Sequence, residues 1–382
     1  MKIPPSTITQ IQKALTQAQN IVIISHRNPD ADTIGSNLAL REFLESAGKN
    51  VTSACVDSPP LDLNFLLNTT DDAKKIQFQK DFFLDQTDLI ITVDCGSIAQ
   101  TSFLEHQPEI LARAAAATNT AVSTKPCATT TATATNPRAN SQNTSPKPIP
   151  IINIDHHPSN NNFGTINLVV PDAASTTIII YNLFNAMNAL PTAAGALEKI
   201  QAHAPFTTTI ATALLAGLYY DTGSFMHSNV TPQVYECAAE LTALGADIKA
   251  IVKNMYKNRS IAQLKTWGKI LDGIKVTNNN VVVSGITKKE LDACNATTAE
   301  TSGIIDYLST VKDAEFATLL VEDDKGNIRG SFRTRKDIVN LSEMAGMFGG
   351  GGHKKASGFT MKGELGREVV WKIQPHQEEK TD

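Results

Sequence analysis

Three stretches of this sequence are almost purely aliphatic and rich in β-branched residues, namely Ile21–Ile24, Asp88–Val93 and Ile151–Ile154. They lack the polar alternation of a strand with one face in water, so each is predicted to be a strand buried on both faces, as in a parallel sheet. Segments of helical period lie before and between them, such as Ser6–Ala18 and Asn37–Ala47. The sequence therefore predicts an α/β fold with a doubly wound, mainly parallel sheet.

Side chains able to bind a metal ion follow each of these strands. The set consists of His26, Asp30 and Asp32 after the first strand, Asp94 after the second, Asp155, His156 and His157 after the third, and Asp221 after the helical segment Thr207–Tyr220. A single aspartate after a strand is more often a helix cap than a ligand. Sites in open α/β sheets form beyond the carboxyl ends of the strands, however, so we expect these groups to meet at one edge of the sheet.

Two further segments carry local signals. Pro29 disfavours the helical conformation at Asn28, so Asp30 and Asp32 are expected in a loop, with a helix beginning at Gly35. Polar and charged residues from Asp247 to Ser260 predict a connector between two domains.

Composition excludes several classes of protein. The net charge of −4 disfavours non-specific binding to long nucleic acid, which normally needs a basic surface. Five cysteines are scattered without a CxxC pair, which favours a reduced compartment and neither a disulfide framework nor a zinc ribbon. The N-terminus lacks a signal-peptide core and no apolar run is long enough to span a membrane. We therefore expect a cytoplasmic protein without membrane contact.

The motifs occur in a recognisable order. HxxxDxD at residues 26–32 is followed by Asp94, by the DHH triplet at 155–157 and by an Asp-Thr-Gly at 221–223. This order resembles the DHH phosphoesterase superfamily. An RxR at 333–335 and a GGGGH at 349–353 resemble the associated C-terminal domain, and together they point to the branch of oligoribonucleases (nano-RNases) and 3′-phosphoadenosine-5′-phosphate (pAp) phosphatases.

The resemblance implies a two-metal centre. Two divalent cations, most simply Mn²⁺ with Mg²⁺ or Co²⁺ as options, would activate a bridging hydroxide for in-line attack at phosphorus. One ion would be held by His26, Asp30 and Asp94, and the other by Asp32, Asp94, His156 and Asp221, with Asp94 shared. His157 would face the substrate phosphate, and Asp155 would orient a ligating histidine. Asp94, Asp155, His156 and His157 are thus the expected catalytic group.

The same resemblance divides the chain. Residues 1–250 would be the metal-binding catalytic domain, 251–261 a connector, 262–374 a smaller mixed α/β substrate-binding domain and 375–382 a polar tail, with the active site in the cleft between the domains. Within the first domain, residues 114–150 contain nine Ala, nine Thr and five Pro without an aromatic residue. This composition predicts a disordered low-complexity insertion. Ala189–Phe206 is a second excursion rich in Ala.

The C-terminal part is predicted to bind the anionic substrate. Ten Lys or Arg stand against four Asp or Glu between Lys325 and Lys372. Arg333 and Arg335 alternate on a predicted strand and would share one face. Backbone N–H groups of the consecutive glycines could approach an anion closely, with a further donor from the histidine; this set comprises Gly350, Gly351, Gly352 and His353. The simpler interpretation is a flexible glycine turn with a solvated lysine pair.

The expected substrates are short RNA oligonucleotides, linear dinucleotides and pAp, as the resemblance implies. Two alternatives stay open. One is an inorganic pyrophosphatase of the same superfamily, which would offer a tight lysine and arginine cradle in its second domain. The other is a non-catalytic nucleotide sensor on this scaffold, which replacement of a metal-type residue would favour. A homodimer is left open.

Overall fold

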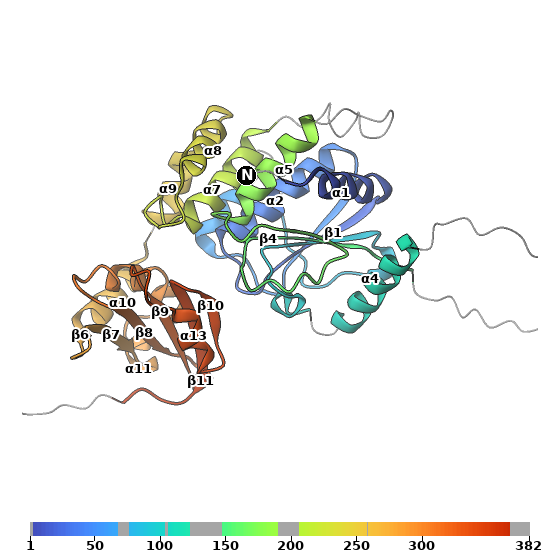
Figure 1. The fold of residues 1–382 in the computed structure, drawn as a ribbon. Coiled ribbons are helices and arrows are strands. Elements are labelled where there is room, and N and C mark those ends of the chain that lie inside the picture. The colour runs from blue at the N-terminus through green and yellow to red at the C-terminus, as the bar shows by residue number, and fades with distance from the viewer. Residues whose placement is uncertain are drawn as a thin grey trace, which may run out of the picture. The chain divides into compact units, whose positions relative to one another are not determined.

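The structure is a computed structural model that describes residues 3–67, 76–103, 106–122, 147–189, 206–257 and 259–366. It divides into two compact units, residues 1–258 and 259–382 (Figure 1). The division falls inside the range expected to connect two domains. Each unit is described by itself. Among the residues that the structure describes, no helix is both long and apolar enough to cross a membrane.

The first unit is built on a five-stranded parallel sheet in the order β2-β1-β3-β4-β5. The strands are β1 (Asn20–Ser25), β2 (Asn50–Ala54), β3 (Leu89–Val93), β4 (Ile151–Asp155) and β5 (Ile166–Val169). The chain reverses its direction across the sheet between β1 and β3, which is where such folds place their sites. The predicted α/β class with a parallel sheet is confirmed. β5, which lies at the edge of the sheet, was not predicted from the sequence.

Successive side chains of the strands point into two different cores. Ile21 and Ile23 of β1 pack with helices on one face, while Val22 and Ile24 pack on the other. Figure 1 shows α1, α2, α5 and α7 over the first face and α4 over the second. The helix bounds are α1 (Pro5–Gln17), α2 (Ala31–Ser46), α3 (Asn64–Leu67), α4 (Gln107–Val122), α5 (Thr176–Ala189), α7 (Thr208–Asp221), α8 (Pro232–Ala243) and α9 (Ile248–Tyr256). Burial on both faces explains why the strands read as continuous aliphatic runs.

The helix after β1 begins earlier than predicted. Asp30 caps α2 with its Oδ1, which accepts hydrogen bonds from the backbone N–H groups of Asp32 and Thr33 at 3.0 Å each. Asp32 therefore lies in the first helical turn and not in a loop. Gly35 lies inside the helix, where a Cβ would come within 2.3 Å of the carbonyl oxygen of Ala213. The glycine allows α2 and α7 to pack closely and does not mark a helix start.

The structure adds detail to two expected segments. The stretch Asp247–Ser260, expected to connect the domains, contains α9, whose N-terminus is capped by Asp247 through a bond to the backbone N–H of Ala250. The stretch expected as a disordered insertion (114–150) is ordered at both ends, because alanine favours the continuation of α4 to Val122 and Ile149 is buried in the second core. Residues 123–146 and most of the second excursion, 190–205, lie outside the described residues.

The second unit is a mixed six-stranded sheet in the order β10-β11-β9-β8-β7-β6. Only β7 and β8 pair in parallel, and the other neighbours are antiparallel. The strands are β6 (Lys275–Val276), β7 (Val281–Ile286), β8 (Phe316–Glu322), β9 (Asn327–Arg333), β10 (Gly351–His353) and β11 (Ala356–Lys362). The helices are α10 (Ile261–Asp272), α11 (Lys288–Ala293), α12 (Ile304–Leu308) and α13 (Leu341–Gly346). The expected mixed α/β character of this part is confirmed.

Candidate metal centre

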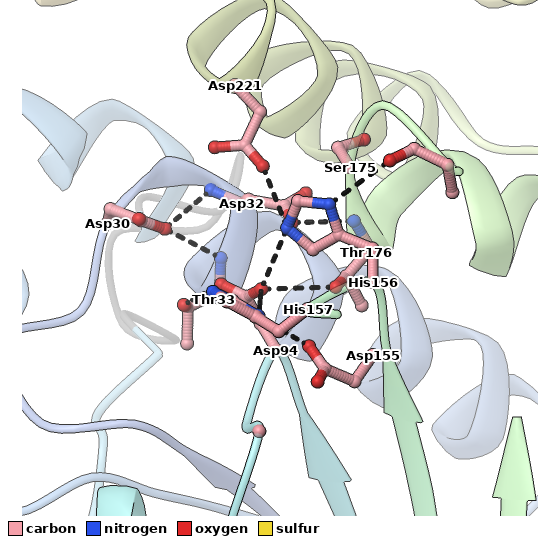
Figure 2. A network of polar contacts seen from close by, with 12 residues as sticks. Asp30, Asp32, Thr33, Asp94, Asp155, His156, His157, Ser175, Thr176 and Asp221 are labelled. Atoms are coloured by element: carbon pink, nitrogen blue, oxygen red, sulfur yellow. Dashed lines mark hydrogen bonds and ion pairs between the residues drawn. The ribbon is translucent and has the colours of Figure 1, made fainter. Parts of the chain in front are cut away.

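The metal-type side chains of the first unit meet where β1, β3 and β4 end and where α7 ends (Figure 2). They form three groups, and within each group the ligand atoms lie within 4.8 Å of one another: His26, Asp30 and Asp94; Asp32, His156 and Asp221; and Asp94, Asp155 and His157. Every residue of the first unit that the sequence singled out is present in this cluster. The first group contains the residues expected at one ion, and the second contains three of the four residues expected at the other, without Asp94.

Asp94 occupies the middle of the cluster, and its two oxygens face different groups. Its Oδ2 lies 3.3 Å from His26 Nε2, and its Oδ1 lies 3.5 Å from His156 Nε2. The hydroxyl of Thr33 donates to Oδ2 at 2.7 Å. The backbone of Asp94 has a φ of 58°, a left-handed conformation that aspartate tolerates better than most residues. The side chain is thus directed by an unusual turn at the end of β3.

The N-terminus of α5 holds the carboxylate of Asp32. The backbone N–H groups of Thr176 and Thr177 donate to it at 2.7 and 2.9 Å, and the hydroxyl of Thr177 donates at 2.8 Å. Asp32 is fully buried, so these donors replace water around its charge. Sequence reasoning missed Thr33, Thr176 and Thr177. The Ser-Thr-Thr run before an aliphatic helix is an N-terminal capping signal that could have drawn attention to the last two.

His156 lies between two carboxylates. Its Nδ1 lies 3.2 Å from the carbonyl oxygen of Ala173, which can only accept, so Nδ1 carries a proton. Its Nε2 is directed at Asp221 Oδ2, 3.2 Å away, as well as at Asp94 (Figure 2). A backbone carbonyl that fixes the tautomer is a common support for a metal-binding imidazole.

The partner of Asp155 differs from expectation. We expected Asp155 to orient a metal-ligating histidine, but its Oδ1 lies 2.7 Å from Nδ1 of His157, the residue expected to face substrate. The reason is geometric: Nδ1 of His156 is already directed at the Ala173 carbonyl. His157 is itself 3.6 Å from Asp94, so the Asp155–His157 pair lies beside the ion-binding groups.

The electrostatics of the cluster favour a bound cation. Burial raises the pKa of Asp30, Asp32 and Asp221, and neighbouring carboxylates raise it further, to about 7 for Asp32. Asp94 is the exception, because bonds and charge from His156 and His26 outweigh burial and hold its pKa well below the usual range. Burial lowers the pKa of His26, but Asp94 and Asp30 outweigh it and raise that pKa to about 10. A divalent cation would relieve the repulsion that raises the carboxyl pKa values.

The donor set fits a hard divalent ion. It offers carboxylate oxygens and imidazole nitrogens, and within the described ranges no metal-capable group includes a cysteine. Cys95 is adjacent to Asp94, but burial and the nearby carboxylates raise the pKa of its thiol well above the ordinary value. Carboxylate oxygens and imidazole nitrogens can hold a divalent ion without a thiolate ligand.

In the second unit, the predicted anion-binding residues lie on or beside the β9 and β10 strands. β9 ends at Arg333, whose Nε pairs with Asp306 at 2.8 Å. Arg335 is exposed and lies two residues beyond the strand on which both arginines were predicted. Gly351 and His353 belong to β10, which pairs with β11, so this stretch is an edge strand and not a flexible turn.

Structure explains part of the glycine run. Gly349 and Gly352 have φ values of 71° and 136°, and a Cβ at Gly350 would come within 2.1 Å of the carbonyl oxygen of Gly358. A Cβ at Gly351 meets nothing within 4 Å. Positive φ or close packing therefore accounts for three of the four glycines and leaves Gly351 for another explanation.

Comparison with known proteins identifies the family. Residues 20–218 match the model of the DHH family, N-terminal domain, and residues 278–374 match that of the DHHA1 domain. The first match spans more than half of the chain. The chain therefore belongs to the DHH family, as the order of its motifs predicted.

Several relatives carry one name. The protein named bifunctional oligoribonuclease and PAP phosphatase NrnA of Bacillus subtilis is 23% identical over 360 residues, which cover 92% of this chain and 93% of the relative. The Thermus thermophilus protein of that name is 28% identical over 213 residues, covering 56% of this chain and 59% of the relative. A probable NrnA of Streptococcus mutans is likewise matched over 61% of its length. The match to these last two thus spans about three fifths of each.

The fold also has a solved counterpart. The crystal structure of an exopolyphosphatase-related protein from Bacteroides fragilis superimposes with a TM-score of 0.73 at 24% identity, covering 96% of this chain and 93% of the other. This likeness shows that the two chains share a fold.

Proposed function

We propose that this chain is a metal-dependent phosphoesterase that hydrolyses short RNA oligonucleotides, linear dinucleotides and pAp. The observation that carries the proposal is the buried cluster in which four carboxylates and three imidazoles surround Asp94 at the carboxyl edge of the sheet. The substrate class rests on the NrnA relatives, whose printed names combine oligoribonuclease and PAP phosphatase.

Two divalent ions, with Mn²⁺ as the first choice, would be held by His26, Asp30 and Asp94 on one side and by Asp32, Asp94, His156 and Asp221 on the other. Such ions supply charge neutralisation and water activation for attack at phosphorus. The protein itself orients the side chains that would hold these ions. The Thr177 hydroxyl and the α5 N–H groups fix Asp32, and the Ala173 carbonyl fixes the tautomer of His156.

His157 is proposed to contact the phosphate under attack. Its ring lies beside Asp94 and is held by Asp155, so its orientation is set before substrate arrives. In the second unit, Arg333, Arg335 and the Gly350–His353 strand are proposed to bind the part of the substrate remote from that phosphate. Gly351, for which packing gives no reason, would let backbone N–H groups approach an anion.

The test is a parallel assay of purified protein with Mn²⁺ on pAp, a dinucleotide, a five-nucleotide RNA, a long RNA and pyrophosphate, with a chelator-treated sample as control. We expect metal-dependent hydrolysis of the first three and little turnover of the long RNA. Hydrolysis of pyrophosphate alone would replace the proposal with the pyrophosphatase alternative. Metal binding without turnover of any substrate would favour a nucleotide sensor.

A further inference from the structure

Asn160 lies in the loop between β4 and β5, three residues after His157, and its side chain contacts four groups. Its Nδ2 donates to Asp155 Oδ2 at 2.6 Å and to the carbonyl oxygen of Cys95 at 3.0 Å. Its Oδ1 accepts from Nδ2 of Asn153 at 3.1 Å and from the backbone N–H of Asn162 at 2.7 Å. Both donor hydrogens and both lone pairs of the amide are thus used.

These partners leave only one orientation for the amide. The carboxylate of Asp155 and the carbonyl of Cys95 can only accept, and the backbone N–H of Asn162 can only donate. Exchanging the oxygen and nitrogen of the Asn160 amide would break at least three of the four bonds. The nitrogen must therefore face Asp155.

Asn160 also links two parts of the site that are far apart in sequence. Through Cys95 it is bonded to the turn that carries Asp94 at the end of β3. Through Asp155 it reaches His157, because one oxygen of that carboxylate faces Asn160 and the other faces Nδ1 of the imidazole. Asp155 is fully buried, so these two partners take the place of water.

We propose that Asn160 is a positioning residue that holds the Asp155 carboxylate and, through it, sets the orientation of the His157 imidazole beside Asp94. The inference rests on the proposed function, in which His157 contacts the phosphate under attack. Asn160 itself touches neither substrate nor ion. It acts by keeping one carboxylate from rotating toward other donors.

Substitution by aspartate separates this role from simple filling of space. Asn160→Asp keeps the shape and the two accepting contacts, to Asn153 and Asn162. It removes both donated bonds and places a second carboxylate against Asp155, which would turn away from His157. A residue needed only for packing would tolerate aspartate better than alanine, whereas a residue that positions Asp155 would not.

The experiment compares Asn160→Asp, Asn160→Ala and a matched control, Asn161→Ala, in which the neighbouring exposed side chain is removed. Loss of a hydrogen bond to a charged group predicts a fall of roughly 10- to 100-fold in kcat/KM for a dinucleotide, mainly in kcat, in both Asn160 variants. We expect kcat/KM of the control variant to stay within about twofold of wild type, as is usual for the loss of an exposed side chain.

Two further readouts make the inference refutable. In a double-mutant cycle, Asn160→Ala should add little to the loss already caused by His157→Ala, because it acts through that residue. The ¹⁵N NMR signal of His157 Nδ1 should shift in Asn160→Asp without any substrate, so this result stands even if the proposed substrates are wrong. Additive losses, an unshifted His157 signal, or wild-type turnover in Asn160→Asp would overturn the inference. If Asn160→Asp does not fold, Asn160→Ser, which adds no charge, carries the same comparison.

Discussion

Replacing Thr177 by valine should weaken metal binding most at low pH. The Thr177 hydroxyl gives Asp32 one of its three hydrogen bonds, at 2.8 Å, and the backbone N–H groups of Thr176 and Thr177 give the other two. Valine keeps the shape of threonine and both N–H donors. Asp32 is fully buried, so no water can replace the lost hydroxyl. A bond to a charged group contributes roughly 1.5–3 kcal/mol, and losing it should raise the Asp32 pKa from about 7 by about one to two pH units.

The sign of the pH dependence follows from this shift. A metal ion binds the deprotonated carboxylate, so the proton competes with it. In the variant, the carboxyl at pH 6.5 would be ionised roughly 8- to 80-fold less often than in wild type, whereas at pH 8.5 the difference would be only about twofold for a midrange shift. The apparent affinity for Mn²⁺ should therefore fall by that factor at pH 6.5 and recover as the pH rises.

Titration calorimetry with Mn²⁺ at the two pH values measures the effect. Thr242→Val serves as control, because its hydroxyl bonds an exposed helix carbonyl, that of Ala238, and not a carboxylate. Wild-type affinity at pH 6.5 would refute the reasoning. An equal loss at both pH values would mean that the hydroxyl orients Asp32 without favouring its ionised form.

Three further predictions concern other parts of the chain. Burial raises the pKa of Asp88, but Lys147 and the backbone N–H of Asn20 outweigh it and lower that pKa to about 2. Asp88→Asn should therefore lower the free energy of unfolding at pH 7 by about 1 kcal/mol, after discounting for solvent screening. In thermal unfolding, the difference from wild type should vanish as the pH falls from 3.8 toward 2. Replacing residues 123–146 by a short glycine-serine linker should leave turnover nearly unchanged, because loop closure costs only about 0.6 kcal/mol per doubling of length. A large loss of turnover in a deletion variant that still folds would assign the segment a role. His353→Ala should lower kcat/KM for a dinucleotide by roughly 10- to 150-fold, but that for a small artificial phosphodiester much less, and equal losses would place His353 at the metal centre or in the fold.

The sequence was sufficient where one local rule decides the structure. Runs such as Ile151–Ile154 can only be buried strands, and parallel strands bring their carboxyl ends to one edge, so the meeting of His26, Asp94 and His156 could be predicted. Asp30 and Asp32 were correctly placed near this edge, but Asp32 lies in the first turn of α2 and not in the predicted loop. Pro29 restricts only the residue before it, so it does not prevent a helix that begins at Ala31 with Asp30 as its cap.

The parts that could not be predicted depend on contacts across the fold. Asp32 is bonded to Thr177, 145 residues away, and Asn160 to the carbonyl of Cys95, 65 residues away. Neither pair has a sequence signature, because the geometry of three or more elements brings them together. Likewise, Asp155 pairs with His157 and not with His156, because Nδ1 of His156 is already directed at the carbonyl oxygen of Ala173. Such supporting contacts are visible only once the fold is known.

The central claim is that the buried carboxylates hold divalent ions around Asp94. The most direct test counts Mn²⁺ in purified wild type and in Asp94→Asn by elemental analysis, with dinucleotide hydrolysis measured on the same samples. Asparagine tolerates the left-handed backbone at this position, so the variant should fold. We predict two ions in wild type and, in the variant, the loss of at least one ion together with hydrolysis. Two ions retained in Asp94→Asn with turnover near wild type would contradict the account.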